Sequence, residues 1–466
     1  MGQRDTRARV AHLFRRAGFG LSPDELAHFS RMGVEGSVEH LVGYGAVANP
    51  AERTYPPPDL TLYSTRLDRL FAEEDLPGTT SRAELRRELR AAFAQIKEII
   101  QTWWINRMLH TSHPLEEKMT LFWHGHFATA LSKTPPVQLL HQNMIFRSLA
   151  LGDFHSLLSR VTQDAAMLNW LDGDQNHRGR PNENLAREVM ELFTLGPGHY
   201  TEADVREGAR ALTGWRLRLV TYKPYWSATL HDDGVKTYLG HTGAFGPQDV
   251  MDILAAHPAT GGFLARKLFS FLAYDNPSAA VIQPVAEAYY TSHHSIKAMV
   301  RQILLSDAFY SDQAFRQHVK SPVEFVVGTV RELGATAPPA VMAQAMTAMG
   351  QDLFNPPNVG GWAGGLRWAT ANALVERYNF AGLLTGQQGA TSYLDTARLA
   401  RQSHAHDTAG FIDYLLGRFL AIAATPTTRA TLIEYAGSAS TLLSPLGETR
   451  RCGLVQLLLS APEYQL

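Results

Sequence analysis

The stretch NENLAREVMELFTLG, residues 182–196, carries the pattern on which the fold assignment rests. At about 100° per residue, its polar side chains fall within an arc of roughly 140° of a helical wheel, and apolar side chains fill the remainder. A helix with two such faces packs its apolar side against other helices. The segment therefore predicts a helix in a helical body. Its polar face consists of Glu183, Asn184, Arg187, Glu188 and Glu191.

The same helical periodicity recurs along most of the chain. Ser22, followed by Pro23 and by Glu25 three positions after the cap, forms a capping box that predicts a helix start. Thr201 and Asp204 give a second start of this kind. Further helices are expected near residues 82–110, 115–130, 136–150, 249–257, 261–273, 279–290, 295–305, 322–333 and 370–384.

Strand signals are confined to residues 216–245. RLRLVTY and WSATLH predict a small β-hairpin, and KTYLGHTG adds a third short strand. The expected fold class is therefore mainly α, a large helical body with a small inserted β-hairpin. The loop TGQQGATS at residues 385–392 suggests a boundary, so we expect a helical domain over residues 1–384 and a C-terminal helical segment over 385–466 that packs on the same body.

Composition excludes several classes of function. The chain has 466 residues and a net charge of -1, so it lacks the basic surface that is typical of nucleic-acid binding. No stretch approaches the ~18 uninterrupted apolar residues that span a membrane. Cys452 is the single cysteine, which excludes an internal disulfide and a thiolate zinc cluster. The first residues contain no apolar run typical of a signal peptide, so the sequence as written predicts a cytoplasmic protein.

Two interpretations of the polar face of residues 182–196 are open. Glu183, Arg187 and Glu191 are spaced four apart and can pair on a solvated surface. Asn184, Glu188 and Glu191 lie at the three- and four-residue spacings that let helical side chains converge on one ion or substrate. Spacing alone does not decide between them.

A second polar group lies in EEKMTLFWHGHFATA, residues 116–130, where His124 and His126 interrupt an apolar run. An imidazole without a partner is costly to bury. In a straight helix, residues two apart point about 200° away from each other, so joint ligation requires a break at Gly125. The pair is either two separately bonded core histidines or part of one metal site.

Two loops add further candidates. HDDGVKTYLG, residues 231–240, places His231 and Asp232 beside an Asp-Gly turn, where they are either turn residues or an acid–base pair. NPPNVGGWAGGLRW, residues 355–368, carries Trp362 and Trp368. These indoles either face a sugar or a peptide, or pin the loop to the core.

Seven segments together resemble the bacterial family called domain of unknown function 1800, over roughly residues 10–384. They are, in order, HLFRRAGFGLSPDEL, KMTLFWHGHF, NENLAREVMELFTLG, YTEADVREGARALTGW, HDDGVKTYLG, AAHPATGGFLARKL and PPNVGGWAGG. The resemblance implies a large, mainly helical protein in which the polar residues of these segments serve one site. Those residues are His124, His126, Glu183, Asn184, Arg187, Glu188, Glu191, His231 and Asp232.

The resemblance also carries expectations that this chain meets only in part. Members often read ELHTLG where this chain has Phe193, so one histidine of the family pattern is missing here. Many relatives are exported and encoded beside a sulfatase-like family called domain of unknown function 1501, which makes a protein of that family a candidate partner.

Three hypotheses about function follow. The first is a metal-dependent hydrolase in which a bound zinc, manganese or iron ion activates water. The second is a non-catalytic glycan- or protein-binding or assembly module that uses Trp362 and Trp368. The third is structural, with the polar groups forming internal hydrogen-bond networks. In the first hypothesis His124, His126, Glu188 and Glu191 are the metal ligands, Glu183, His231 and Asp232 are the acid–base residues, and Asn184 and Arg187 hold the substrate.

Overall fold

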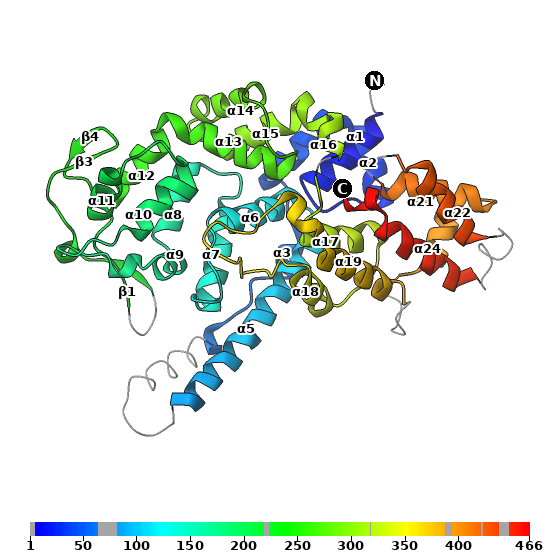
Figure 1. The fold of residues 1–466 in the computed structure, drawn as a ribbon, viewed down its shortest axis with the longest axis horizontal. Helices are drawn as coiled ribbons and strands as arrows, with labels where there is room; N and C mark the ends of the chain where they lie inside the picture. The colour runs from blue at the N-terminus through cyan, green and yellow to red at the C-terminus, as the bar shows by residue number, and fades with distance from the viewer. Residues whose placement is uncertain are drawn as a thin grey trace.

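The computed structural model describes residues 5–63, 82–218, 223–316, 318–386, 394–420, 423–437 and 447–466 (Figure 1). Helices make up nearly all of the regular structure in these ranges, and the strands there form two small antiparallel pairs. The predicted mainly α fold is therefore confirmed. None of the helices described is long and apolar enough to cross a membrane.

The helices lie where the periodicity placed them. The first part of the chain forms α1 (Thr6–Arg16), α2 (Pro23–Val42), α3 (Pro50–Thr54), α5 (Arg82–His110), α6 (Pro114–His126), α7 (Pro136–Ser148), α8 (Phe154–Thr162) and α9 (Ala165–Trp170). The middle part forms α10 (Glu183–Glu188), α11 (Glu202–Ala211), α12 (Pro247–Ala256), α13 (Pro258–Leu272), α14 (Ala279–Thr291), α15 (Ile296–Leu305), α16 (Asp312–Arg316) and α17 (Pro322–Leu333). The last part forms α18 (Pro339–Ala348), α19 (Ala371–Leu384), α20 (Thr396–Ser403), α21 (Thr408–Phe419), α22 (Pro426–Ala436) and α24 (Glu448–Ser460).

Both predicted capping boxes are confirmed. The backbone N–H of Glu25 donates to the Ser22 hydroxyl at 3.3 Å, and the Glu25 carboxylate accepts from the backbone of Ser22 at 2.8 Å. Thr201 and Asp204 make the same reciprocal pair at the start of α11. Each box satisfies two backbone N–H groups that the first helical turn leaves without an internal partner.

The segment after α10 differs from the prediction. Residues Val189–Thr194 form a π-helical turn, η3, in place of a continued α-helix. Hydrogen bonds in this turn span five residues. The Thr194 hydroxyl donates to the backbone carbonyl of Val189 at 2.6 Å. The backbone N–H of Leu195 likewise donates to Met190 at 2.8 Å. A wheel drawn at about 100° per residue is therefore wrong beyond Glu188.

The inserted β structure is confirmed, although it consists of two hairpins. Strand β1 (Trp215–Leu217) pairs with β2 (Pro224–Trp226), and β3 (Lys236–Tyr238) pairs with β4 (His241–Gly243). The single third strand predicted for KTYLGHTG is wrong, because Leu239 and Gly240 have φ angles of 46° and 80° and reverse the chain within it. Residues 219–222 of the predicted hairpin lie outside the described residues.

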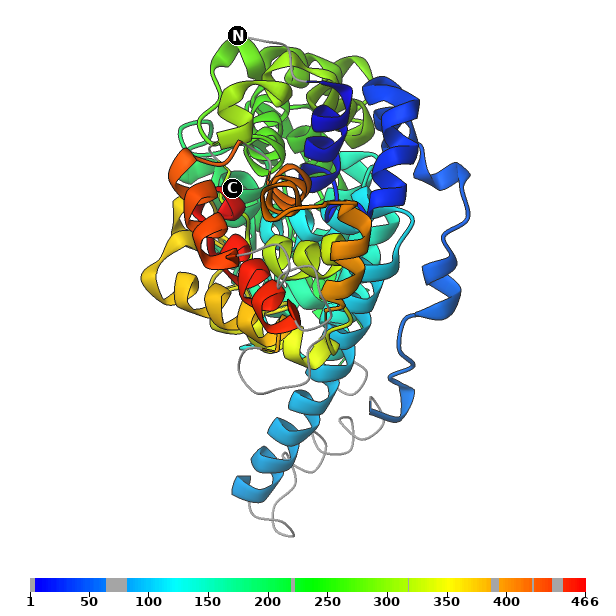
Figure 2. The same cartoon turned by 90° about the vertical axis from the view of Figure 1, so that its right-hand side faces the viewer.

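Buried apolar side chains form two clusters. The first joins α1 and α2 to the helices from α6 to α15, and the second joins α5 and α17–α19 to the C-terminal helices. Helix α6 contributes to both, with Trp123 in the first and Leu121 in the second. Leu384 and Leu394 belong to the same cluster, so the C-terminal segment packs on the body beside α19 (Figure 1). Figure 2 shows that α5 extends well beyond this body. The division into domains at residue 384 stays a prediction.

Candidate functional site

A pocket with a volume of about 410 Å³ opens beside the C-terminal end of α6. Small-molecule sites commonly measure about 300–1,000 Å³. Its walls come from α6, α13, the start of α17 and the loop that carries the two tryptophans. Three of the residues singled out in the sequence, His126, Trp362 and Trp368, line it. The pocket therefore brings together segments that lie far apart in the chain.

Gly361 lets the tryptophan loop lie directly on α6. A Cβ atom on Gly361 would lie 2.1 Å from the carbonyl oxygen of Gly125, and Gly361 has a φ of 81°. A Cβ atom on Gly125 would lie 3.7 Å from the indole of Trp362. The approach requires glycine at position 361, whereas 3.7 Å at position 125 is an ordinary van der Waals distance. The segments HGH at residues 124–126 and VGGW at residues 359–362 therefore lie in contact and together form part of the pocket wall.

His126 is neutral and has one free nitrogen. Its Nε2–H donates to the backbone carbonyl of Phe193 at 3.0 Å, which leaves Nδ1 as the acceptor nitrogen. Nδ1 is buried and has no hydrogen-bond partner among the described residues. Burial, and then the nearby Lys267, hold the pKa of His126 well below its usual value. The ring can therefore accept a hydrogen bond from a molecule that reaches Nδ1.

Phe193 occupies the place where the family pattern often has histidine. Its side chain is fully buried, and its ring centroid lies 5.0 Å from that of Phe127 and 6.0 Å from that of His126. The missing histidine is therefore replaced by a core aromatic residue, and only the backbone of Phe193 takes part in the polar contacts described here.

Lys267 adds a positive charge to the lining of the pocket. Its Nζ donates to the carbonyl of Leu192 at 3.2 Å, and no carboxylate of the described chain lies within 4.0 Å of it. Burial lowers the pKa of Lys267 to about 8, so the ammonium form still predominates at neutral pH. Arg266 beside it is exposed and also lines the pocket. This wall therefore favours an anion.

Glu324, which lines the pocket, forms a buried charged pair with Lys118. Lys118 donates to one carboxylate oxygen of Glu324, and His318 donates to the other at 3.0 Å. Burial opposes ionisation, but Lys118 and His318 together hold the pKa of Glu324 well below its usual value. Burial, and then Arg16, lower the pKa of His318 to about 4, so its ring is neutral at pH 7. Lys118 thus balances the charge of Glu324, while Asp275 lines the pocket as an exposed carboxylate.

His124 takes part in a different network. Its Nε2 accepts from the Asn143 amide at 2.9 Å, and the Asn143 carbonyl accepts from Arg147. Arg147 in turn donates twice to Glu117, at 2.7 and 3.1 Å. Burial, and then Arg147, lower the pKa of His124 to about 3. Because α6 stays helical through Gly125, the two histidines point into separate networks, as the wheel predicts for an unbroken helix.

The start of the polar face of residues 182–196 forms ion pairs at the surface. Arg187 donates to both oxygens of Glu202, at 2.7 and 2.9 Å, and to Glu183 at 3.2 Å. The Glu183 and Glu202 side chains are 43% and 66% exposed, and Asn184 is exposed as well. These contacts match the solvated-face interpretation.

The remaining two glutamates of that face are partly buried. Glu191 accepts from the Tyr200 hydroxyl at 2.6 Å. Burial, and then Glu191, raise the pKa of Glu188. Neither carboxylate lines the pocket beside α6.

His231 and Asp232 attach the hairpin region to the end of α11. His231 Nδ1 donates to the backbone carbonyl of Thr213 at 2.9 Å. Asp232 accepts from the guanidinium of Arg210 at 2.8 and 3.2 Å. The Arg210 hydrogen bonds lower the pKa of Asp232 to about 2, so it stays ionised.

The structure does not bring the four predicted metal ligands, His124, His126, Glu188 and Glu191, together. Of the residues described, one group of three His or carboxylate side chains has its ligand atoms within 4.8 Å of one another, and it consists of Glu52, His113 and Glu116. The acid–base roles of Glu183, His231 and Asp232 and the substrate roles of Asn184 and Arg187 stay predictions, because none of these five residues lines the pocket.

Sequence reasoning missed most of the charged residues of the pocket. Lys267 lies in a helix whose apolar spacing was recognised, but a single lysine among core positions carries no distinct signal. Glu324 completes a capping box with Ser321, which already accounts for its presence at the start of α17. His113 and Glu116 flank a proline at a helix start, and only the fold brings Glu52 to them.

Comparison with known proteins identifies a family. The family model described as "Protein of unknown function (DUF1800)" matches residues 12–466, which includes the C-terminal segment that the seven motifs leave out. Neither the curated proteins nor the solved structures gave a match.

Proposed function

The chain belongs to the DUF1800 family, and from its own pocket we propose that it binds a small acidic sugar beside the end of α6. The observation that carries the proposal is Lys267, a largely buried cation without a carboxylate partner among the described residues, which lines the same pocket as Trp362. A cation held in this way gains from an anionic ligand.

The aromatic side chains account for a ring in the ligand. Trp362 is partly exposed, Trp368 is 8% exposed, and both line the pocket together with Phe122 and Phe271. Flat apolar faces with a polar handle suit the faces of a sugar ring. The volume of about 410 Å³ suits a ligand of small-molecule size.

The polar atoms account for hydroxyl groups in the ligand. Trp362 Nε1 is a donor and His126 Nδ1 an acceptor, and both are buried without a partner in the part of the chain that the structure describes. Leaving such an atom unsatisfied costs about 1–3 kcal/mol. A hydroxylated ligand that reaches them supplies both missing partners, because a hydroxyl group donates and accepts.

The balance of charge accounts for the acidic group. Two cations, Arg266 and Lys267, and one exposed carboxylate, Asp275, line the pocket. The charge of Glu324, which also lines it, is balanced by Lys118. Cations therefore exceed carboxylates at the wall. A carboxylate on the sugar gains a charge-assisted hydrogen bond that a neutral sugar does not.

Calorimetric titration with D-glucuronate and D-glucose tests the proposal. A hydrogen bond to a charged group is worth about 1.5–3 kcal/mol, so glucuronate should bind about 10- to 100-fold more tightly than glucose. Lys267→Met should remove that preference, whereas Trp362→Leu should weaken both sugars. Lys297→Met changes an exposed lysine outside the pocket and serves as the control. Equal affinity for both sugars, or an unchanged preference in Lys267→Met, would overturn the proposal.

A further inference from the structure

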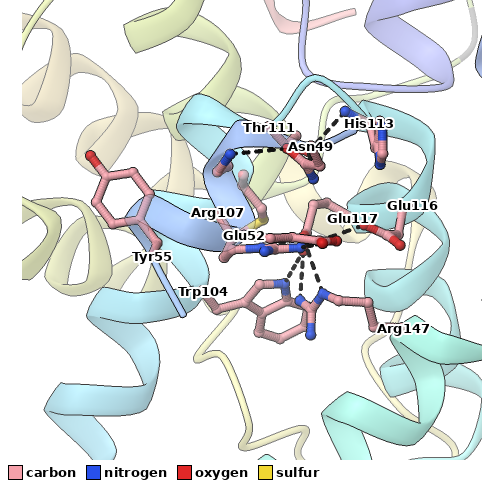
Figure 3. A network of polar contacts seen from close by, with 12 residues as sticks. Asn49, Glu52, Tyr55, Trp104, Arg107, Thr111, His113, Glu116, Glu117 and Arg147 are labelled. Carbon is pink, nitrogen blue, oxygen red and sulfur yellow. Dashed lines mark hydrogen bonds and ion pairs between the residues drawn. The ribbon is translucent and has the colours of Figure 1, made fainter. Parts of the chain in front are cut away.

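We propose that Glu52, His113 and Glu116 form a binding site for a divalent transition-metal ion. The three side chains meet where α3 lies against the start of α6 (Figure 3). The pocket described above is lined by α6 residues between positions 121 and 126, which lie five to ten residues or roughly 8–15 Å further along the helix than Glu116. The two proposals are therefore independent.

The geometry of the three residues suits one ion. One ligand atom from each residue lies within 4.8 Å of the others. His113 and Glu116 are 6% and 8% exposed, and Glu52 closes the group from the surface side with a side chain that is 56% exposed. Donor atoms around a zinc ion sit about 2.0–2.2 Å from it, so the three side chains must move slightly closer together when an ion binds. Water can take the fourth position.

Two buried atoms of the cluster, His113 Nε2 and Glu116 Oε2, make no hydrogen bond among the described residues. A neutral imidazole nitrogen that makes no hydrogen bond can offer its lone pair to an ion. An ion at this point supplies a partner for both atoms.

The neighbouring guanidinium groups are bonded mainly to Glu117. Glu117 accepts from Arg147 at 2.7 Å, from Arg107 Nε at 3.1 Å and from the Trp104 indole at 3.0 Å (Figure 3). Arg107 Nη2 remains 3.5 Å from Glu116 and 3.7 Å from Glu52 without a hydrogen bond. These two contacts are long, so they leave the carboxylates free to bind an ion. The network also contains one more carboxylate than guanidinium groups, which favours an added cation.

The donor set indicates which ion binds. One imidazole nitrogen and two carboxylates suit zinc, manganese or iron, and an imidazole disfavours calcium and magnesium. Zinc binds such donors more tightly than manganese or iron(II) does. The ion would connect α3 to α6. Two hydrogen bonds already hold the segment that contains α3, one on each side of Glu52. The Asn49 side-chain amide donates to the Thr111 hydroxyl at 3.0 Å, and the Trp103 indole donates to the backbone carbonyl of Tyr55 at 3.1 Å.

Titration of the metal-free, untagged full chain with Zn²⁺ tests the site. We expect one ion per chain. Glu52→Gln should weaken binding at least about tenfold, because it removes a ligand. Glu52 is exposed, so the fold should tolerate the substitution. His113→Gln should abolish binding. Glu98→Gln and His141→Gln change exposed residues elsewhere and should bind as the wild type does.

Limited trypsin digestion gives a second measurement. Arg53 is exposed in α3 next to Glu52, so Zn²⁺ should slow cleavage after Arg53 in the wild type and not in Glu52→Gln. Absence of saturable binding, or equal binding and equal protection in Glu52→Gln and His113→Gln, would overturn the site. Glucuronate titrations in the presence of a chelator measure sugar binding without bound metal, so the two proposals can fail independently.

Discussion

Gly361 lies so close to Gly125 that a Cβ atom at position 361 would come within 2.1 Å of the Gly125 carbonyl oxygen. The two residues belong to different motifs, one at the end of α6 and one in the tryptophan loop. The contact holds the tryptophan loop against α6 beside the pocket, and a side chain at position 361 would not fit there.

We expect Gly361→Ala to destabilise the protein and to weaken sugar binding. Its φ of 81° is strained for alanine, at a cost of about 1–3 kcal/mol, and the added methyl group would strike the α6 backbone. Gly262→Ala is the matched control, because it lies within α13 with open space around it, and alanine stabilises a helix interior by about 0.5–1 kcal/mol. Urea denaturation measures both changes. A Gly361→Ala variant as stable as the wild type would contradict the close packing of the loop.

The affinity for glucuronate should depend on pH through Lys267. Its pKa, which burial lowers to about 8, means that the ammonium is present below pH 8 and is lost as the pH rises through that value. Affinity should therefore be constant between pH 6 and about 7 and fall above pH 8. Lys267→Arg keeps its charge to higher pH and should remove the decline. Titrations at several pH values check this, and a constant affinity up to pH 10 in the wild type would count against Lys267.

The Lys118–Glu324 pair should contribute strongly to stability. Glu324→Gln leaves a buried ammonium without its counter-charge, which typically costs about 3–5 kcal/mol of unfolding free energy. The double variant Lys118→Met with Glu324→Gln should recover most of that loss, because no unpaired charge is left. The glutamine side-chain oxygen can still accept from Ser321 and His318.

The same pair has a defined pH dependence. The pKa of Glu324 is depressed in the folded state, so its contribution is present above the pKa of the unfolded carboxyl and is lost as the pH falls through the folded value. The difference between the wild type and Glu324→Gln should shrink on acidification. Denaturant unfolding across acid pH measures it, and a difference that stays constant would show that the carboxylate charge is not the cause.

Arg187→Met should change neither sugar affinity nor the unfolding midpoint. Arg187 forms its ion pairs at the surface and is not part of the pocket. Thermal unfolding and calorimetry check both quantities. A large loss of sugar binding in this variant would revive the prediction that the polar face of residues 182–196 holds the substrate.

The fold could be predicted because its signals are local. Capping boxes at Ser22 and Thr201 and apolar periodicity define helices within a few residues of where they lie. The π-helical turn after Glu188 could not be predicted in this way, because it arises from tertiary packing of a sequence that also fits an α-helix.

The site could be predicted only in part. His126, Trp362 and Trp368 were recognised because they are unusual in their segments. Lys267 and Glu324 were not, because their importance depends on which charges lie beside them after folding. His124 looks equivalent to His126 in the sequence, yet an unbroken helix directs the two rings to different partners.

A crystal structure of the protein with D-glucuronate tests the central claim most directly. We predict electron density for the sugar in the pocket beside α6, with its carboxylate bonded to Lys267 and its ring against Trp362. A sugar bound at a different place, with the α6 pocket empty in crystals that contain saturating glucuronate, would contradict the account.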